Sequence, residues 1–519
     1  MSWDYERSLQ RAWDKYAETE GLTVTPVLRE MDFGNISLKE PRRVRAAHFY
    51  IDVCNFTALL GHAAAAGVDQ EEDMIRRLHL YAREITRVVE EDLDATKVHF
   101  QSAKLHALAY RPISSDAGMA VKAVLAAAAV RETAKVFNKV FALSGTDAWQ
   151  TAAGVDFGDA VVTKDGVGGD RELLFLGHPA NMAAKIIRGG LRLTSEVVAL
   201  LPDSFDQYLA EAVDDPNVMC FAPSAAALED LIGDRGYTWS RERTQKRLEA
   251  DVEAYPPGTT VVSSTRAPID KSRLGIRNTK QVDGVSLFAD VDGFTKYVDQ
   301  AAAIDEDLVE AVRAYHVIRS EMRNTAVVDF DGLRIQYQGD RMQVLAYLPL
   351  DDQEGAAVRA VRIAAALSSV VTDVLPQVIG VAAKPLAIGL AAGTTLVSKL
   401  GEYGNRDVVC LGSATVEAAR IQVGLDGGDI GLDAELYSRL PDWLQKAFTW
   451  RKSPGAYVAA GLTLDELERL EAAESPDRAK TLLTGGAVGT GLALGAGAAT
   501  LIRRAERTEP PLRPWHPDA

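Results

Sequence analysis

The residues best suited to chemistry are two aspartates at the ends of predicted strands. Asp290 follows the apolar start of "FADVDGFT" at 288–295, and Asp340 lies in "QGDR", between two segments of alternating polarity. Aspartates at such turns are often only turn formers. Two turns of one small sheet can also converge, and their carboxylates then suit Mg²⁺ or Mn²⁺, which prefer oxygen ligands. The pair therefore predicts a divalent-metal site.

The segments around these aspartates occur twice in the chain, in the same order. Matching segments are offset by 235 to 239 residues, which predicts two copies of one domain. Within each copy, strand-like and helical periodicities alternate in the manner of an α+β sandwich. The matches are "FYIDVCNFT" (49–57) with "FADVDGFT", "KVHFQSAKLHALAYRP" (97–112) with "RIQYQGDRMQVLAYLP" (334–349), and "RELLFLGHPANMAAKI" (171–186) with "RDVVCLGSATVEAARI" (406–421).

The repeat and the changes of composition around it predict how the chain is divided. Between the copies, an acidic start, a charged helical stretch and a final loop indicate a spacer. The expected segments are a helical extension at 1–40, a first domain at 41–213, a helical linker at 214–280, a second domain at 281–462, a helical connector at 463–480, a glycine-rich segment at 481–502 and a basic, proline-rich tail at 503–519.

Charge and cysteine content limit the partners and the compartment. The net charge of −16 argues against nucleic acid as a partner, because phosphate binding needs clustered cations. The three cysteines are scattered without metal-ligand spacing, which is typical of a reducing compartment. The charged N-terminus lacks the apolar stretch of a secretory signal. We therefore expect the catalytic region to be cytoplasmic.

The glycine-rich segment predicts contact with a membrane. "TLLTGGAVGTGLALGAGAATLI" at 481–502 carries no charge, and its length is close to the ~20 residues that cross a bilayer as a helix. Its glycines also have the small-xxx-small spacing that lets transmembrane helices approach closely. The alternative is a buried, glycine-rich loop or helix. We expect membrane association through this single C-terminal helix.

The repeated motifs resemble those of the class III nucleotidyl cyclases, the adenylate and guanylate cyclase catalytic domains. "FADVDGFT", "QGDR" and "LGSATVEAAR" (411–420) resemble the family's signatures in their order, and the first copy is similar over "FYIDVCNFT", "QSAK" and "LGHPANMAAK" (176–185). The resemblance implies two tandem α+β cyclase-like domains that pair head to tail within the chain as a pseudo-dimer. It also implies that each active site takes residues from both domains.

One of these composite sites matches the family's pattern nearly completely. The resemblance implies that Asp290, Asp340 and the backbone of Val291 bind two Mg²⁺ or Mn²⁺ ions. Asn181 would orient the ribose, and Lys185, in place of the family's arginine, would stabilise charge on the α-phosphate. A lysine is a point charge rather than a planar fork, so turnover could be reduced. The alternative is that Lys185 is an ordinary solvent-exposed cation on a helix.

The turn after Asp290 predicts where phosphates bind. Its backbone N–H groups precede a predicted helix, and such helix starts attract anions. Gly293, Phe294 and Thr295 are therefore the expected phosphate-binding residues. Asp292 is expected to be a turn residue, because the family's pattern requires no carboxylate there.

The second composite site matches the pattern poorly. It would contain Asp52 and Arg420, but Ala103 and Val416 replace the family's second aspartate and its asparagine. The nearly complete set of residues therefore falls on one side of the interface. We expect one working site and one degenerate site.

The positions that usually read a purine are His99 and Leu174. Leu174 cannot hydrogen-bond a base, so the site lacks the polar pair that normally distinguishes purines. This absence favours a pyrimidine, as in the Pycsar antiphage cyclases, which make cyclic UMP or cyclic CMP. His99 can equally be a strand residue that faces a polar surface.

The resemblance implies an enzyme that converts a nucleoside triphosphate into a 3′,5′-cyclic nucleotide and pyrophosphate. The product would act on a downstream effector as an antiphage messenger. The alternative is an inactive pseudo-cyclase, acting as a nucleotide sensor or a membrane-associated scaffold. The substitutions at Lys185 and Leu174 favour this alternative, whereas the intact Asp290 and Asp340 oppose it.

Overall fold

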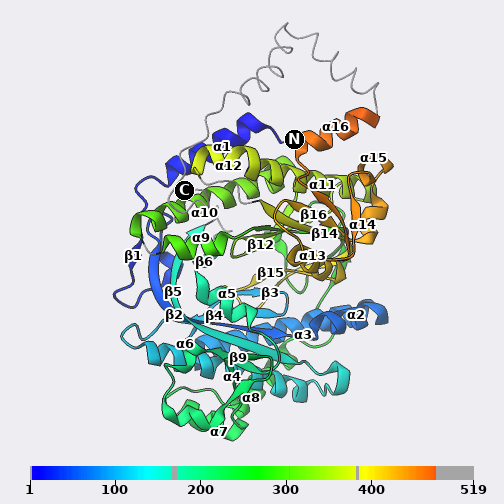
Figure 1. Ribbon diagram of the computed structural model, residues 1–519. Helices are drawn as coiled ribbons and strands as arrows, with labels where there is room; N and C mark the ends of the chain where they lie inside the picture. Colours follow the sequence, from blue (N-terminus) through cyan, green and yellow to red (C-terminus); the bar gives the residue numbers. More distant parts are fainter. Residues whose placement is uncertain (1–2, 166–171, 303, 381–384, 475–519) are drawn as a thin grey trace.

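The computed structural model describes residues 3–165, 172–302, 304–380 and 385–474, and shows a mixed α+β protein (Figure 1). It contains two nine-stranded sheets with the same strand order. The first is β3-β4-β2-β5-β7-β9-β8, with β1 beside β2 and β6 beside β5. The second is β12-β13-β11-β14-β16-β18-β17, with β10 beside β11 and β15 beside β14.

The first half of the molecule, residues 25–233, holds the first sheet and its helices. Its strands are β1 (Thr25–Pro26), β2 (Arg42–Val53), β3 (Thr96–Gln101), β4 (Lys104–Ala109), β5 (Thr151–Asp165), β6 (Glu172–Leu176), β7 (Leu191–Thr194), β8 (Leu209–Ala212) and β9 (Asp215–Phe221). Its helices are α2 (Phe56–Ala66), α3 (Val68–Arg87), α4 (Asp116–Val140), α5 (His178–Lys185), α6 (Ser195–Val198) and α7 (Ala225–Gly233). Since β9 pairs with β7 and β8, the sheet continues past the boundary expected at 213.

The second half, residues 262–474, repeats this order of elements. Its strands are β10 (Val262–Ser264), β11 (Thr279–Val291), β12 (Leu333–Gln338), β13 (Arg341–Ala346), β14 (Leu386–Leu400), β15 (Asp407–Leu411), β16 (Asp429–Leu432), β17 (Thr449–Arg451) and β18 (Ala456–Ala460). Its helices are α9 (Phe294–Ala301), α10 (Asp305–Arg323), α11 (Gln353–Ser369), α12 (Leu375–Ile379), α13 (Ser413–Val423), α14 (Ala434–Arg439), α15 (Asp442–Gln445) and α16 (Leu464–Glu474).

The central strands β2 and β11 place their core residues on one face of the sheet and their aspartates on the other. Successive side chains of a strand point to opposite faces of the sheet. Phe49 and Ile51 of β2 are buried in the core under α3 and α4, and Leu287 of β11 is buried in the core under α10 and α11. Asp52 and Asp290 occupy the alternate positions of these strands. Their carboxylates therefore belong to the faces that the helical layers leave uncovered.

Side-chain contacts join the two halves. The Lys97 ammonium lies 2.6 Å from the Asp407 carboxylate, and both groups are largely buried. On the other flank, the Arg334 guanidinium lies 2.5 Å from the Glu172 carboxylate. These ion pairs connect the hairpin of each half to strand β6 or β15 of the other half, on either side of the space between the sheets.

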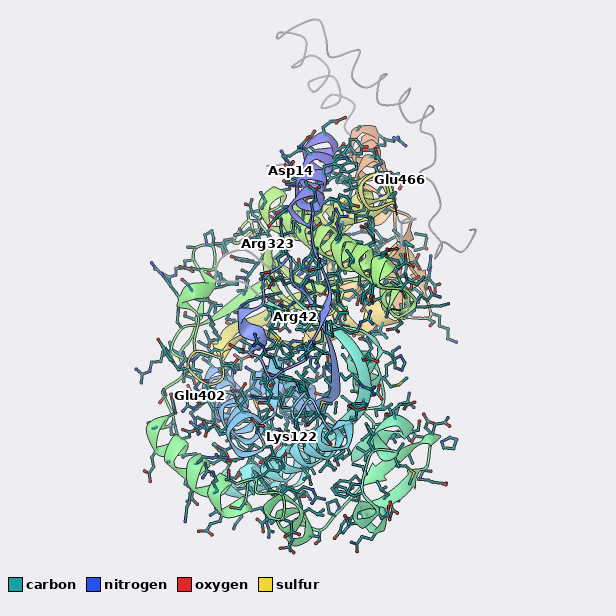
Figure 2. The ribbon with its side chains drawn as sticks, turned by 90° about the vertical axis from the view of Figure 1, so that its left-hand side faces the viewer. Asp14, Arg42, Lys122, Arg323, Glu402 and Glu466 are labelled. Atoms are coloured by element: carbon teal, nitrogen blue, oxygen red, sulfur yellow. The ribbon has the colours of Figure 1, made fainter. Side chains whose placement is uncertain are left out.

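Two further helices are exchanged between the halves. Helix α1 (Tyr5–Glu18) precedes the first half in sequence but packs on α10 and α12 of the second. Helix α8 (Arg241–Ala254) precedes the second half but packs on α3 and α4 of the first. Figure 1 shows them at opposite ends of the molecule, and Figure 2 shows Asp14 of α1 near Arg323, far from Lys122 of α4. The structural repeat thus begins at α1 and α8.

An arginine on each exchanged helix binds two buried carboxylates of the half on which it packs. Arg11 of α1 donates from Nε to Glu321 at 3.1 Å and from Nη2 to Asp329 at 2.9 Å. Asp329 ends the π-helical turn η7 (Asn324–Asp329) that follows α10. In the first half, Arg247 binds the corresponding pair in the same way, with distances of 3.0 Å to Glu84 and 2.6 Å to Asp92. We call each group an arginine latch.

The expectation of a membrane-anchored chain is corrected by the structure. Within the described ranges, no helix combines the length and the apolar character needed to cross a membrane. The long helix α4 is instead buried against β2 and β5 as part of the first core. The segment 481–502, on which the expectation rested, lies outside the described residues.

Candidate active site

A cavity of about 940 Å³ lies between the two halves and is lined by residues of both. It brings together nearly all the residues predicted for the complete composite site. From the first half come His99, Leu174, Asn181 and Lys185, and from the second half come Asp290, Val291, Gly293, Phe294 and Asp340. Thr295 follows in the first turn of α9.

Asp290 and Asp340 reach the cavity from neighbouring strand ends. Asp290 is the penultimate residue of β11, and Asp340 lies in the tight turn between β12 and β13. Gly339 makes this turn possible, because its φ of 70° lies in the left-handed region that favours glycine. The Tyr315 hydroxyl donates to the Gly339 carbonyl at 2.6 Å and fixes the turn. The backbone therefore holds the two carboxylates at one end of the cavity.

The electrostatics of this pair favour a bound cation. Burial raises the pKa of Asp290, and burial together with the neighbouring Asp290 charge raises the pKa of Asp340 well above its ordinary value. Arg341 opposes both shifts, while burial lowers the pKa of its own guanidinium. Two close carboxylates become easier to ionise when positive charge lies between them. This donor chemistry fits hard divalent ions.

The remaining ligands of such an ion would not be side chains of the usual metal-binding types. Among the described residues, no three His, Cys, Asp or Glu side chains gather into a metal-binding group. Mg²⁺ is commonly held by one or two carboxylates, with water and substrate phosphates completing its shell. The backbone carbonyl of Val291 and the substrate are therefore the expected additional donors.

The start of α9 lines the end of the cavity at which phosphate binding is predicted, here called the phosphate end. Gly293, with a φ of 68°, is the N-cap residue of α9, and Phe294 is buried behind it. Lys296, in the same first turn, also lines the cavity. Exposed N–H groups at a helix start and a nearby ammonium both attract phosphate. Motif comparison with the first copy did not identify Lys296, because Ala58 stands there.

Helix α5 presents Asn181 and Lys185 to the cavity together. They are four residues apart, so they lie on one face of the helix. Pro179, Ala180 and Ala183 of α5 are buried, and the helix packs against β5 and β2. The position of this short helix therefore sets where both side chains can act.

The base end of the cavity is a wall of aromatic and imidazole rings. His99 and Leu174, for which base binding is predicted, line the cavity, and Tyr50 stacks on His106 with ring centroids 4.2 Å apart. His106 is hydrogen-bonded to His48 at 3.1 Å. Burial lowers the pKa of His48 to about 3 and that of His99 to about 4, so these rings are neutral near pH 7. The imidazole rings of this wall can therefore form hydrogen bonds while they are uncharged.

The motif comparison did not identify two further cavity residues near this end. Tyr50 lies two residues before Asp52 on β2, and His106 lies two residues after Lys104 on β4. Strand alternation places each pair on one face. That periodicity could have identified both residues.

The degenerate site is a smaller cavity of about 230 Å³ on the other side of the shared interface. Asp52 lines it and lies 3.5 Å from the Lys104 ammonium, which supplies a positive charge within the protein. Ala103 and Val416 also line it, as predicted. Arg420 does not, because its guanidinium is held by Glu417 and by the carbonyl of Pro454, both at 2.6 Å. Its expected place in this site is therefore corrected.

The comparisons with known proteins agree with this geometry. No known protein-family model matches the chain. A uridylate cyclase of Pseudomonas aeruginosa is 30% identical over 466 residues, covering 86% of this chain and 88% of the relative. A uridylate cyclase of a Rhizobium species is 26% identical over 430 residues, covering 78% of this chain and 80% of the relative. The crystal structure of a class III adenylyl cyclase-like ATP-binding protein from Pseudomonas aeruginosa superposes with a TM-score of 0.77 and 28% identity, covering 91% of this chain and all of that one.

Proposed function

Because the chain belongs to the class III nucleotide cyclases, within the pyrimidine cyclase subclass, we propose that it converts UTP into 3′,5′-cyclic UMP and pyrophosphate. The observation that carries this proposal is the cavity between the halves. It unites the carboxylates of Asp290 and Asp340 with Asn181 and Lys185 from the other half. The corresponding second cavity contains one aspartate, already paired with a lysine.

Each of the cavity residues has its own role in the reaction. The ribose 3′-hydroxyl attacks the α-phosphorus, the bond from that phosphorus to the bridging oxygen breaks, and pyrophosphate leaves. Asn181 orients the ribose, and the Lys185 ammonium meets the charge that develops on the α-phosphate oxygens. The N–H groups of Gly293 and Phe294 receive the phosphates, and the hydroxyl proton passes to water.

Divalent ions complete this arrangement. Two Mg²⁺ or Mn²⁺ ions held by Asp290, Asp340 and the Val291 carbonyl would lower the pKa of the 3′-hydroxyl and neutralise the triphosphate. The raised pKa values of the two carboxylates support this assignment, since a bound cation relieves their repulsion. The same buried pair without a cation would favour a protonated Asp340.

The base end of the cavity supports uracil as the base. Leu174 leaves one purine-reading position without a hydrogen-bonding group, and the stacked Tyr50 and His106 rings occupy space beside it. The neutral imidazole of His99 lines the cavity, with its Nε2 hydrogen-bonded to the Gln101 side chain. Two relatives are named uridylate cyclases, whereas the structural neighbour is named an ATP-binding protein. Direct comparison of bases is therefore the decisive test.

The test is to incubate the full chain separately with ATP, GTP, UTP and CTP in the presence of Mn²⁺. We expect cyclic UMP from UTP, and a loss of at least ~100-fold in Asp290→Ala and Asp340→Ala, because each removes a metal ligand. Asp52→Ala is the matched control, since it removes the equivalent aspartate of the degenerate site. A purine product, or a product that survives Asp290→Ala, would refute the proposal. Metal-dependent nucleotide binding without any product would support a pseudo-cyclase sensor.

We also propose that cyclic UMP is a messenger in antiphage defence, read by a separate effector. The resemblance to Pycsar cyclases supports this role. The test is phage plating on a host whose own copy carries Asp290→Ala. We expect loss of both infection-induced cyclic UMP and resistance. Unchanged resistance would show that the cyclase activity is not needed for defence against phage.

A further inference from the structure

Helix α5, which carries Asn181 and Lys185, lacks a capping side chain of its own. The first N–H groups of a helix have no partner within the helix and need acceptors from elsewhere. The N-cap residue of α5 is Gly177, which has no side chain to accept them. Its φ is 136°, and a Cβ there would lie 3.0 Å from the Asp159 carbonyl oxygen. Gly177 therefore cannot readily be replaced by a capping serine or aspartate.

Asp299 of the second half places a carboxylate beside this position. It lines the same cavity as Asn181 and Lys185, and the backbone N–H of His178, the first residue of α5, lowers the pKa of Asp299. Its Oδ2 also lies 3.9 Å from Nδ1 of the His178 ring. Burial raises the pKa of Asp299, while His178 and Lys185 oppose that shift. The carboxylate thus lies at the start of the helix that carries Asn181 and Lys185.

Asp299 belongs to the same short helix that begins at the phosphate end of the cavity. Helix α9 starts directly after the turn that follows Asp290, and it packs against α5 (Figure 1). One face of the metal-binding half is therefore tied, through Asp299, to the helix that presents Asn181 and Lys185. A shift of α9 relative to α5 would move the two parts of the composite site apart.

The degenerate interface provides an internal comparison. Gly61 of α2 corresponds to Asp299, because both lie five residues after the phenylalanine of the shared "FT" motif. Helix α2 packs against α13, which begins after Gly412 as α5 begins after Gly177. Gly61 has no side chain that could cap α13. The carboxylate between the halves is thus present only beside the complete site.

We propose that Asp299 is a positioning residue, which caps α5 across the interface and holds Asn181 and Lys185 against the bound triphosphate. This inference rests on the proposed composite site. Displacing reacting groups by about 1 Å can cost about 100-fold in rate. Since Asn181 and Lys185 act mainly as charge develops, loss of the cap should lower kcat more than it raises KM.

The experiment measures cyclic UMP formation by the full chain and its variants at saturating metal. We expect Asp299→Ala to lower kcat about tenfold and to change KM for UTP less than about threefold. Asp299→Asn keeps an oxygen acceptor, and asparagine caps helices about as well as aspartate, so most of kcat should return. An Asn variant as slow as the Ala variant would overturn the capping role. Gln300→Ala, the exposed neighbour on α9, is the matched control.

A double-mutant cycle tests whether Asp299 acts through α5. Adding Asp299→Ala to Lys185→Ala should cause a smaller further loss than Asp299→Ala causes in the wild type, because one of the two groups that the cap positions is already absent. Fully multiplicative losses would contradict the proposal. If the wild type makes no cyclic nucleotide, the proposed function fails. If the wild type is active and Asp299→Ala matches Gln300→Ala, only this inference fails.

Discussion

Removing Arg11 should release α1 from the second half and destabilise that half. Glu321 and Asp329 are each 1% exposed, and Arg11 contacts both. Deleting one partner of a buried ion pair typically costs about 3–5 kcal/mol, because the remaining charge stays buried. The Ser8 hydroxyl still donates to Glu321 at 2.7 Å, and Arg7 still reaches Asp329 at 2.9 Å. We therefore expect the lower end, about 3 kcal/mol, for Arg11→Ala.

The pH dependence of this loss identifies its cause. Burial raises the pKa of Glu321 above its ordinary value, although Arg11 opposes the shift. A carboxyl with a raised pKa in the folded state contributes stability that is present below its unfolded pKa and is lost as pH rises through the folded pKa. Without Arg11 the folded pKa should rise further. The difference in free energy of unfolding between wild type and Arg11→Ala should therefore increase as pH is raised from about 4.5 to 8.

Urea unfolding measures the stability, and amide hydrogen exchange of α1 measures whether the helix is released. Lys15→Ala is the control on the same helix, because its partner Glu18 is solvent-exposed and such pairs contribute less than about 1 kcal/mol. Replacing Arg11, Glu321 and Asp329 together by apolar residues should recover stability. Equal unfolding and equal α1 protection in wild type and Arg11→Ala would refute the latch.

Three further changes test other parts of the structure. Tyr50→Ala opens the base wall, so turnover of ATP relative to UTP should rise about tenfold in a direct competition assay. Lys185→Arg restores a planar fork to the α-phosphate, so kcat should rise, by up to about tenfold, and a fall would show that the site is built around an ammonium. In the first latch, burial raises the pKa of Glu84 to about 7 although Arg247 opposes the shift. The stability of Glu84→Gln relative to wild type should therefore increase from pH 5 to pH 8 in urea unfolding, because wild type alone loses stability as Glu84 ionises.

The sequence predicted the α+β class and the central chemistry because those features depend on local patterns. Asp290 and Asp340 stand at strand ends that short motifs identify, and the same motifs mark Asn181 and Lys185. The mixed α+β class with two sheets is confirmed. The family resemblance is confirmed by the uridylate cyclase relatives. The larger cavity is lined by motif residues of both halves, among them Asn181 and Asp290.

The exchange of α1 and α8 could not be read from the sequence. At an offset of 236 residues the starts of the two helices are similar, since Glu6 matches Glu242, Arg7 matches Arg243 and the latch arginine Arg11 matches Arg247, but this similarity does not show on which half each helix packs. Helical periodicity shows that a helix has a buried face, but not which half buries it. The partners of each arginine lie on the other half, at sequence separations of 155 to 318 residues. Only the three-dimensional structure shows that the helix preceding one half in sequence packs on the other half.

The sequence did not predict the position of a side chain where neighbouring residues compete to bind it. Arg420 follows the family's motif, yet Glu417 lies one helical turn earlier and captures its guanidinium. Asp299 and Gln422 carry no motif, and Gln422 donates to Asp290 at 3.3 Å only because α13 crosses the end of β11. Such contacts depend on packing between elements, which short motifs do not encode.

Different positions along one face of each central strand line the two cavities, which explains why the two sites could diverge separately. Asp52 lines the degenerate cavity, whereas Tyr50, two residues away on the same face of β2, lines the complete one. On β11 the roles are reversed, since Asp290 lines the complete cavity and Phe288 the degenerate one. Each strand therefore contributes to both sites through different residues. The first half can carry Ala103 in the smaller cavity without changing the larger one, but it cannot freely change Tyr50, because that residue lines the cavity that also contains Asp290 and Asp340.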